Sequence, residues 1–132
     1  MQYECTLDRA GLIDLALHRY FAAVDRKDLA ETLACFHDEA LFTIQTSFTR
    51  HAGKAELERM FKDFFGSWEQ IVHKDFVTTV DAANGRIAAS FEAVLTAADG
   101  SVTRLSNTNF WRVRGERFQE VHVYMSGANV LV

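Results

Sequence analysis

The chain has 132 residues, a formal net charge of −4 and 48% hydrophobic residues, among them 11 Phe, and it contains no Pro. This length predicts a single domain over residues 1–132 with one core. Acidic and basic residues are interspersed without a basic run, which argues against a nucleic-acid or membrane partner and favours a small apolar molecule.

The first predicted element is a helix over residues 7–25. Its apolar positions are spaced three and four residues apart, which places them on one helix face. Thr6 and Asp8 are the candidate N-caps. The apolar positions are Ile13, Leu17, Tyr20, Phe21 and Val24. We therefore expect Tyr20 to point toward whatever this helix covers.

A second helix is predicted at about residues 29–36. Asp28 followed by Glu31 forms a capping-box pattern, which starts a new helix rather than continuing the first one. Asp25 therefore lies at a corner between two helices. The residues that the second helix should bury are Leu29, Leu33 and Phe36.

A strand and a third helix follow. Between residues 40 and 46 the apolar period becomes two, which predicts a strand with Phe42 and Ile44 on one side. After a polar turn or short return strand at residues 46–52, the third helix carries a wide apolar stripe and ends near Gly66. The stripe consists of Leu57, Met60, Phe61, Phe64 and Phe65.

The rest of the chain predicts four antiparallel strands in meander order. Two of the connecting turns contain Asn84-Gly85 and Asp99-Gly100, which are strong hairpin signals. The strands are expected at residues 70–81, 86–97, 102–113 and 117–125. With three helices ahead of them, these strands predict an α+β domain whose curved sheet wraps the long first helix.

Two asparagines are predicted on the inner face of the strand at residues 102–113. The apolar residues of this face are Leu105, Trp111 and Val113. The same period of two places Asn107 and Asn109 beside them. An unpaired buried Asn costs about 1–3 kcal/mol, so each must bond either a neighbouring backbone group or a ligand.

Among the histidines, His73 is the one predicted to point inward, because its parity partners Ile71 and Val77 are apolar. It is either a core histidine bonded to a backbone group or part of a site. The histidines expected at the surface are His18, His37 and His51.

The outer sheet face is more aromatic than a solvated face requires. It carries Phe110, His122 and Tyr124 beside Arg112 and Glu120. An exposed patch of this kind commonly marks association, so we expect a homodimer through this face, with simple solvation as the alternative.

The cysteines and the absence of certain motifs indicate the cellular compartment and limit the possible chemistry. Cys5 and Cys35 have no CxxC or zinc spacing, and no leader or apolar run of about 18 residues is seen. We therefore expect a cytoplasmic protein with reduced thiols. There is no HxxxH or HExxH motif, so neither a metal nor another cofactor is expected.

Four features in this order resemble the nuclear transport factor 2-like (NTF2-like) superfamily, and within it the SnoaL-like proteins. They are RYFAAVDRKDLAETLACFHDEALF, Gly53 at the start of the third helix, IVHKDFV and FWRVRGERFQEVHVY. The resemblance covers essentially the entire chain. It implies a cone-shaped, cystatin-like α+β fold, with three N-terminal helices packed on a strongly curved, mainly antiparallel sheet.

The chain is also similar to the scytalone dehydratase subset, in which an acidic residue and a histidine form a pocket pair. Asp25 and His73 occupy the matching places. The carboxylate would fix the imidazole tautomer and raise its basicity. Tyr20 would donate a hydrogen bond to a substrate oxygen that gains charge, with Asn109 as a second donor. The resemblance thus implies that the catalytic residues are His73, Asp25 and Tyr20.

Three positions depart from the relatives. Ile44 stands where steroid-isomerase-like members have a carboxylate base, and Asn109 stands at their acidic oxyanion donor. Phe91 or a neighbour replaces the second pocket histidine of the dehydratase-like pattern. The predicted substrate-binding residues are Asn109, Ile44, Phe91, Trp111 and Phe61.

These residues predict a cofactor-independent lyase or isomerase for a small, apolar cyclic or aromatic carbonyl compound. The alternative is a non-catalytic module of the same fold that binds a small hydrophobic ligand or serves in assembly. A third hypothesis is a structural subunit beside a larger aromatic-ring oxygenase. Only the aromatic outer sheet face supports it.

Overall fold

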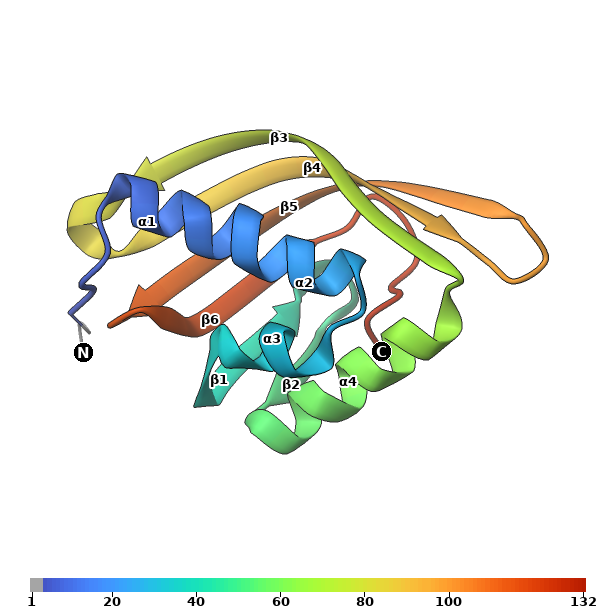
Figure 1. Cartoon of the computed structure of the whole chain (residues 1–132), viewed down its shortest axis with the longest axis horizontal. Helices are drawn as coiled ribbons and strands as arrows, with labels where there is room; N and C mark the ends of the chain where they lie inside the picture. Colours follow the sequence, from blue (N-terminus) through green and yellow to red (C-terminus); the bar gives the residue numbers. More distant parts are fainter. Residues whose placement is uncertain (1–3) are drawn as a thin grey trace.

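The structure, a computed structural model, describes residues 4–132 (Figure 1). Its helical segments are α1 (Arg9–Ile13), the π-helical η1 (Asp14–Phe21), α2 (Ala22–Asp25), α3 (Leu29–Ala34) and α4 (Lys54–Ser67), with short 3-10 turns η2 (Gln45–Ser47) and η3 (Ala82–Asn84). Its strands are β1 (Phe36–Ile44), β2 (Thr49–Ala52), β3 (Gln70–Asp81), β4 (Arg86–Thr96), β5 (Val102–Arg114) and β6 (Arg117–Tyr124). Within this range no helix is long and apolar enough to cross a membrane.

The strands form one six-stranded sheet in the order β2-β1-β6-β5-β4-β3. The meander from β3 to β6 is antiparallel as predicted, while β1 lies parallel to β6 and antiparallel to β2. The sheet curls around the first helix, and α4 packs against α3, β1 and β2 (Figure 1). The predicted cone-shaped α+β fold with a curved, mainly antiparallel sheet is therefore confirmed.

The first helix is continuous from α1 through η1 to α2, and Asp8 caps it by accepting a 2.8 Å hydrogen bond from the Gly11 amide. A π-helical turn is wider than an α-helical one, so it shifts which residues face the core. Ile13 and Leu17 are only half-buried for this reason, although we predicted them on the apolar face. The fully buried positions are Leu12, Leu15, Ala16, Tyr20, Phe21, Ala23 and Val24.

The second helix is shorter than predicted. Asp28 caps it as expected, accepting a 3.1 Å bond from the Glu31 amide. Phe36, however, already belongs to β1, because the chain enters the sheet opposite Phe118, whose amide donates to the Cys35 carbonyl at 2.8 Å. In α3 it is Thr32 that is buried, whereas the predicted Leu29 and Leu33 are half-buried.

An irregularity in β3 changes which of its side chains point inward. The pairing with β4 shifts register between Lys74 and Val77, and Asp75 takes a left-handed conformation with φ +60°. An extra residue of this kind reverses the alternation beyond it. Val77 is therefore 72% exposed, contrary to its predicted inward parity, and Phe76 packs on the core instead. His73 precedes the bulge and keeps its inward direction.

Two of the histidines predicted at the surface are not there. His51 is buried on β2, and its Nε2 lies 2.8 Å from the Leu131 carbonyl oxygen. His37 is half-buried, with Nε2 2.6 Å from the Arg114 carbonyl oxygen. Both bonds join residues far apart in the sequence, which periodicity does not register. His18 is exposed as predicted.

Both cysteines are free thiols, as expected. Cys35 is buried and its sulfur donates to the Glu31 carbonyl. Burial is the main cause that raises the pKa of the Cys35 thiol to about 11. The thiol is therefore protonated at neutral pH.

The turn between β3 and β4 requires glycine at position 85. Gly85 has φ +64°, and a Cβ there would lie 2.6 Å from the Cys5 Cβ and 2.9 Å from the Val113 carbonyl oxygen. Gly85→Ala should lower the free energy of unfolding in urea by about 2–4 kcal/mol, from backbone strain plus steric overlap. Gly100→Ala is the matched control, because Gly100 has φ +86° but nothing within 4 Å, and should cost only about 1 kcal/mol. Equal losses of unfolding free energy in the two variants would show that the steric overlap at Gly85 contributes nothing.

Candidate functional site

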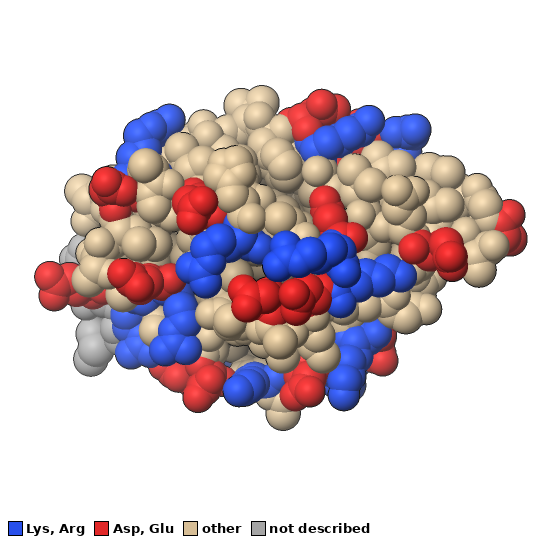
Figure 2. All heavy atoms as spheres, in the orientation of Figure 1, with Lys and Arg blue, Asp and Glu red and all other residues tan. Residues whose placement is uncertain are grey.

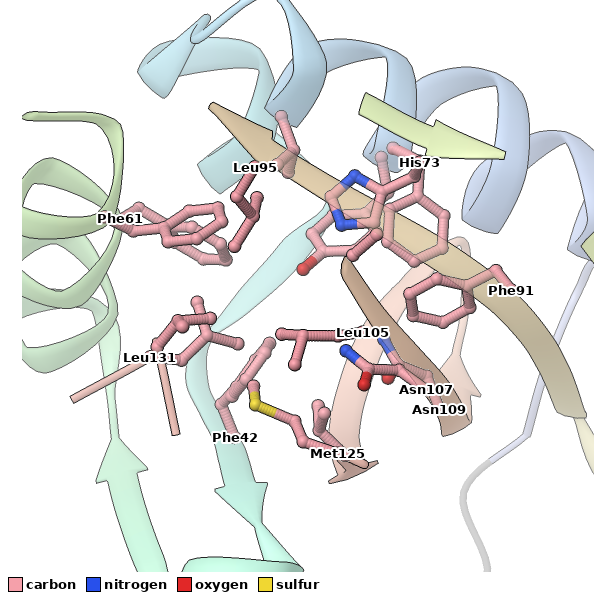
Figure 3. A pocket seen from close by; sticks show the side chains of 17 residues that line it. Phe42, Phe61, His73, Phe91, Leu95, Leu105, Asn107, Asn109, Met125 and Leu131 are labelled. Carbon is pink, nitrogen blue, oxygen red and sulfur yellow. The ribbon is translucent and has the colours of Figure 1, made fainter. Parts of the chain in front are cut away.

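A small cavity lies inside the cone, between the first helix, α4 and the concave face of the sheet (Figure 3). Its volume is about 30 Å³, which is room for little more than one or two water molecules. Its polar lining residues are Tyr20, His73, Asn107 and Asn109. Its aromatic lining residues are Phe21, Phe42, Phe61, Phe64 and Phe91.

Asp25 and His73 form the central polar contact of this site. Asp25 Oδ1 lies 2.6 Å from His73 Nδ1, and Oδ2 accepts a 3.0 Å hydrogen bond from the His73 backbone amide. The predicted contact between the two residues is thus confirmed. Because the carboxylate accepts from Nδ1–H, the neutral ring keeps its lone pair on Nε2, the nitrogen that can accept a proton.

Aromatic rings hold the His73 imidazole in place. Phe21 stacks on it with ring centroids 4.4 Å apart, and Phe91 meets it edge-on at 5.4 Å. Phe21 was predicted on the apolar helix face but not as a site residue. The π-helical segment turns both Tyr20 and Phe21 inward, and no local sequence signal marked that segment.

Tyr20 is a buried residue that lines the cavity. Its ring packs edge-on against Phe36 and Phe118, but its hydroxyl makes no hydrogen bond with any residue in 4–132. Burial, reinforced by the charges of Cys35 and Asp25, raises the pKa of Tyr20 far above the ordinary 10.0. The phenol therefore stays protonated at neutral pH, so it can donate to an oxygen that gains negative charge.

The two inner asparagines have different surroundings. Asn107 Oδ1 accepts a 3.4 Å bond from the Ser126 amide, which makes it a structural link. Asn109 is only 3% exposed, and its Oδ1 has no hydrogen-bond partner among the described residues. A buried amide oxygen without a partner is costly, so Asn109 is the asparagine that a ligand or water would satisfy.

The predicted substrate-binding residues are not all brought together. Asn109, Phe91 and Phe61 line the cavity, but Ile44 and Trp111 lie in the core outside its lining. The side chains of Ile44 and Trp111 both point inward as predicted. They lie, however, at a different level along the cone from the cavity. Trp111 instead stacks on the ring of Phe118 at 5.8 Å.

Val130 and Leu131 also line the cavity, which no pattern in the sequence predicted. They follow the last strand and belong to no periodic pattern. In Figure 3 the Leu131 side chain lies near Phe61 and Phe42, across the cavity from His73.

The lining of the cavity contains no Lys, Arg, Asp or Glu among the described residues. Charged side chains of both signs lie instead on the outside, where they are interspersed (Figure 2). Over residues 4–132 no group of three or more His, Cys, Asp or Glu is placed to hold a metal ion. The interior is thus an apolar space with a few convergent polar groups, as small-molecule sites commonly are.

The SnoaL-like domain family model matches residues 17–121. No curated protein matches the chain in sequence. A similar solved structure is a candidate polyketide cyclase from Pseudomonas putida KT2440, with 20% identity, a TM-score of 0.76, and coverage of 86% of this chain and 90% of that chain.

Two further structures share the fold. A candidate aromatic ring hydroxylase from Novosphingobium aromaticivorans has 22% identity and a TM-score of 0.79, covering 92% of this chain and 90% of that one. A candidate ketosteroid isomerase from Kribbella flavida DSM 17836 has 18% identity and a TM-score of 0.69, covering 91% and 81%. At these identities the likeness establishes the fold.

Removing the Tyr20 hydroxyl should not weaken the fold. Because no protein hydrogen bond to this hydroxyl is found among residues 4–132, Tyr20→Phe should leave the free energy of unfolding at pH 7 unchanged or raise it by up to about 1 kcal/mol. Thr32→Val is the control, since the buried Thr32 hydroxyl donates to the Asp28 carbonyl at 2.7 Å, and its loss should cost about 1 kcal/mol. Urea denaturation measures both.

The same variant tests the raised pKa of Tyr20. A folded-state pKa above the unfolded value contributes stability that is present below about pH 10 and is lost as the pH rises further. Tyr20→Phe should therefore lose less stability than the parent chain above pH 10. A large destabilisation at pH 7 would show that the hydroxyl is bonded in the folded chain, and identical alkaline profiles would show that folding does not raise its pKa.

Proposed function

Because this chain belongs to the SnoaL-like domain family of the NTF2-like superfamily, we propose that it is a cofactor-independent lyase or isomerase acting on a small, apolar cyclic or aromatic carbonyl compound. The observation that carries the proposal is the Asp25–His73 pair, joined at 2.6 Å beside an aromatic-lined cavity. A carboxylate that orients an imidazole is the usual means by which a protein positions a general base.

His73 is the proposed acid/base. Its Nε2 takes a proton from the carbon next to the substrate carbonyl, and the positive charge that forms on the ring lies beside the Asp25 carboxylate. Asp25 is the orienting residue, since it also binds the His73 backbone amide at 3.0 Å. The stacked Phe21 ring limits the directions in which the imidazole can turn.

Tyr20 and Asn109 are the proposed donors to the substrate oxygen. When the α-proton leaves, the carbonyl oxygen gains negative charge, and a protonated phenol in an apolar cavity stabilises that charge strongly. The Asn109 side-chain amide is the second donor. The Tyr20 hydroxyl and the Asn109 oxygen have no protein hydrogen bond among residues 4–132, so neither side chain must give up such a bond at these atoms to face a ligand.

Two outcomes use this same apparatus. In isomerisation, the proton held on His73 returns to a different carbon of the enolate. In elimination, a hydroxide leaves from the β-carbon, takes the proton from His73 and departs as water. The residues are the same in both reactions, so the proposal covers a lyase or an isomerase.

The lining supports an uncharged, ring-shaped substrate. A carboxylate or phosphate would be buried with no cation in the described lining to compensate it, which is costly. The aromatic walls fit flat apolar rings. The names of two structural neighbours, polyketide cyclase and ketosteroid isomerase, support a carbonyl substrate.

A binding module without catalysis is the second candidate. It is favoured by Ile44 and Phe91, which stand where similar proteins carry a carboxylate base and a second histidine. In that case the aromatic cavity would hold an apolar ligand unchanged.

The test uses 3-hydroxy-1-tetralone, which loses water to give 1-naphthol, and 3-cyclohexenone, which isomerises to the conjugated enone. We expect turnover of one of them, with kcat lowered about 100-fold or more by His73→Ala and by Asp25→Asn. Asp38→Asn, an exposed carboxylate on β1, is the control and should change nothing. Unchanged rates in Asp25→Asn would refute the proposed pair, and binding of 1-naphthol without turnover of either ketone would favour the binding module.

We also propose that two copies associate through the outer sheet face. Phe110 and Tyr124 are 47% and 45% exposed there, with ring centroids 5.8 Å apart. Beside them Arg112 and Glu120 pair at 3.1 Å, so the patch has an apolar centre and a neutralised rim.

Light scattering of the eluting protein tests this association. The parent chain should elute with a dimer mass, and Phe110→Glu combined with Tyr124→Glu should give a monomer, because each copy would bury uncompensated charge. Phe48→Glu is the control, since Phe48 is 95% exposed on the β1–β2 turn and should not affect the mass. A monomeric parent chain at about 100 µM would contradict the proposal.

A further inference from the structure

We infer that residues 127–132, here called the C-terminal strap, form a lid over the cavity, and that His51 is the residue that fastens it. This inference rests on the proposed function only in that the cavity receives a ligand. It assigns a positioning role to a buried histidine that lies outside the lining of the site.

The cavity as it stands is too small for a ring-shaped ligand. Its volume is about 30 Å³, whereas an apolar cavity that holds benzene measures about 150 Å³. A ring-shaped ligand therefore requires part of the wall to move. Val130 and Leu131 of the strap are two of the wall residues, and the strap crosses from the end of β6 to α4 (Figure 1).

The strap is the part of the wall with the weakest attachment. The other lining residues lie on the first helix, α4 and the strands, where the backbone is held by regular hydrogen bonds, or at Met125 directly after β6. The strap has no helix or strand, and its Leu131 amide bonds only locally, to Asn129 Oδ1 at 2.8 Å. Segments held in this way open at lower cost than a folded core.

Side chains from β2 and α4 tether the strap. His51 Nε2 lies 2.8 Å from the Leu131 carbonyl oxygen, and Arg59 Nη1 donates to the Val132 carbonyl at 3.2 Å. Asn129 Nδ2 donates to Thr49 Oγ1 at 3.2 Å. These hydrogen-bond partners of the strap thus all lie on β2 or α4, next to the cavity.

Arg59 determines which tautomer His51 adopts. Its Nη2 lies 3.2 Å from His51 Nδ1, and a guanidinium can only donate, so Nδ1 must accept. The hydrogen of the ring therefore sits on Nε2 and is donated to Leu131. Asp63 holds Arg59 in turn, at 2.9 Å. This chain of bonds gives His51 one defined role, which is to hold the strap closed.

The test compares His51→Ala with a chain that ends at Asn129. His37→Ala is the matched control, because His37 also bonds a distant carbonyl through Nε2, but at Arg114, whose position is not part of the cavity lining. Removal of the buried imidazole could disturb β2 in His51→Ala. The truncated chain keeps His51 and therefore still tests the strap in that case.

Hydrogen exchange measures the opening without any ligand. In the parent chain the amides of 127–132 should exchange at least 100-fold faster than the core amides of β5. His51→Ala should accelerate exchange in the strap by about threefold to tenfold, the value of one neutral hydrogen bond, and leave β5 unchanged. His37→Ala should leave the strap as it is. Equal protection of the strap and β5 would overturn the lid, whatever the cavity binds.

Entry of a neutral aromatic fluorophore, N-phenyl-1-naphthylamine, measures access. Its association rate in stopped flow should rise about threefold to tenfold in His51→Ala, and further in the truncated chain. Rates in the truncated chain within twofold of the parent would overturn the lid. Faster entry in both variants without turnover of either ketone would keep the lid and refute the proposed chemistry. Failure of the fluorophore to enter even the truncated chain would overturn both.

Discussion

The two-pronged contact of Asp25 with His73 ties the first helix to the sheet, and the geometry of the cavity depends on it. One carboxylate oxygen binds the imidazole and the other binds the backbone amide of the same residue. The two residues are 48 positions apart, so this contact fixes where the end of α2 meets β3. A charged acceptor makes shorter and stronger hydrogen bonds than a neutral one. The position of the helix, and with it that of Tyr20, follows from this anchor.

The sequence predicted the elements whose signals are local. Period-two patterns and glycine turns located β3 to β6 to within one residue at every end, and the stripe of α4 was correct at every position. The features it missed depend on contacts between distant segments. The bulge at Asp75 is one example: His73 was predicted inward partly because of Val77, yet the bulge turns Val77 outward. The buried His51 is another, because its partner lies 80 residues away.

For the site, the alternation of residues along the strands predicted which side chains point inward. It did not predict at which level of the cone each side chain lies. Asn109, Ile44 and Trp111 all point inward as expected, but only Asn109 reaches the cavity, because the other two lie at other levels of the cone. The contact of Asp25 with His73 could be predicted only through the resemblance to known proteins, since no local pattern relates a helix end to a residue 48 positions later. The C-terminal part of the wall could not be foreseen, since Val130 and Leu131 follow the last periodic segment.

The π-helical stretch Asp14–Phe21 has a consequence for how this fold can diversify. A π-helical turn corresponds to an α-helix that has gained one residue, and one residue of an α-helix turns the chain by about 100°. Deleting a single residue between the Asp8 cap and Tyr20 would therefore turn the part of the helix before the deletion by about 100° relative to Tyr20 and Asp25, which stay anchored through His73. Among related chains, a change of length by one residue in this helix would exchange the side chains that the N-terminal part of the helix packs on the sheet, while the chemical group offered to the ligand stays the same.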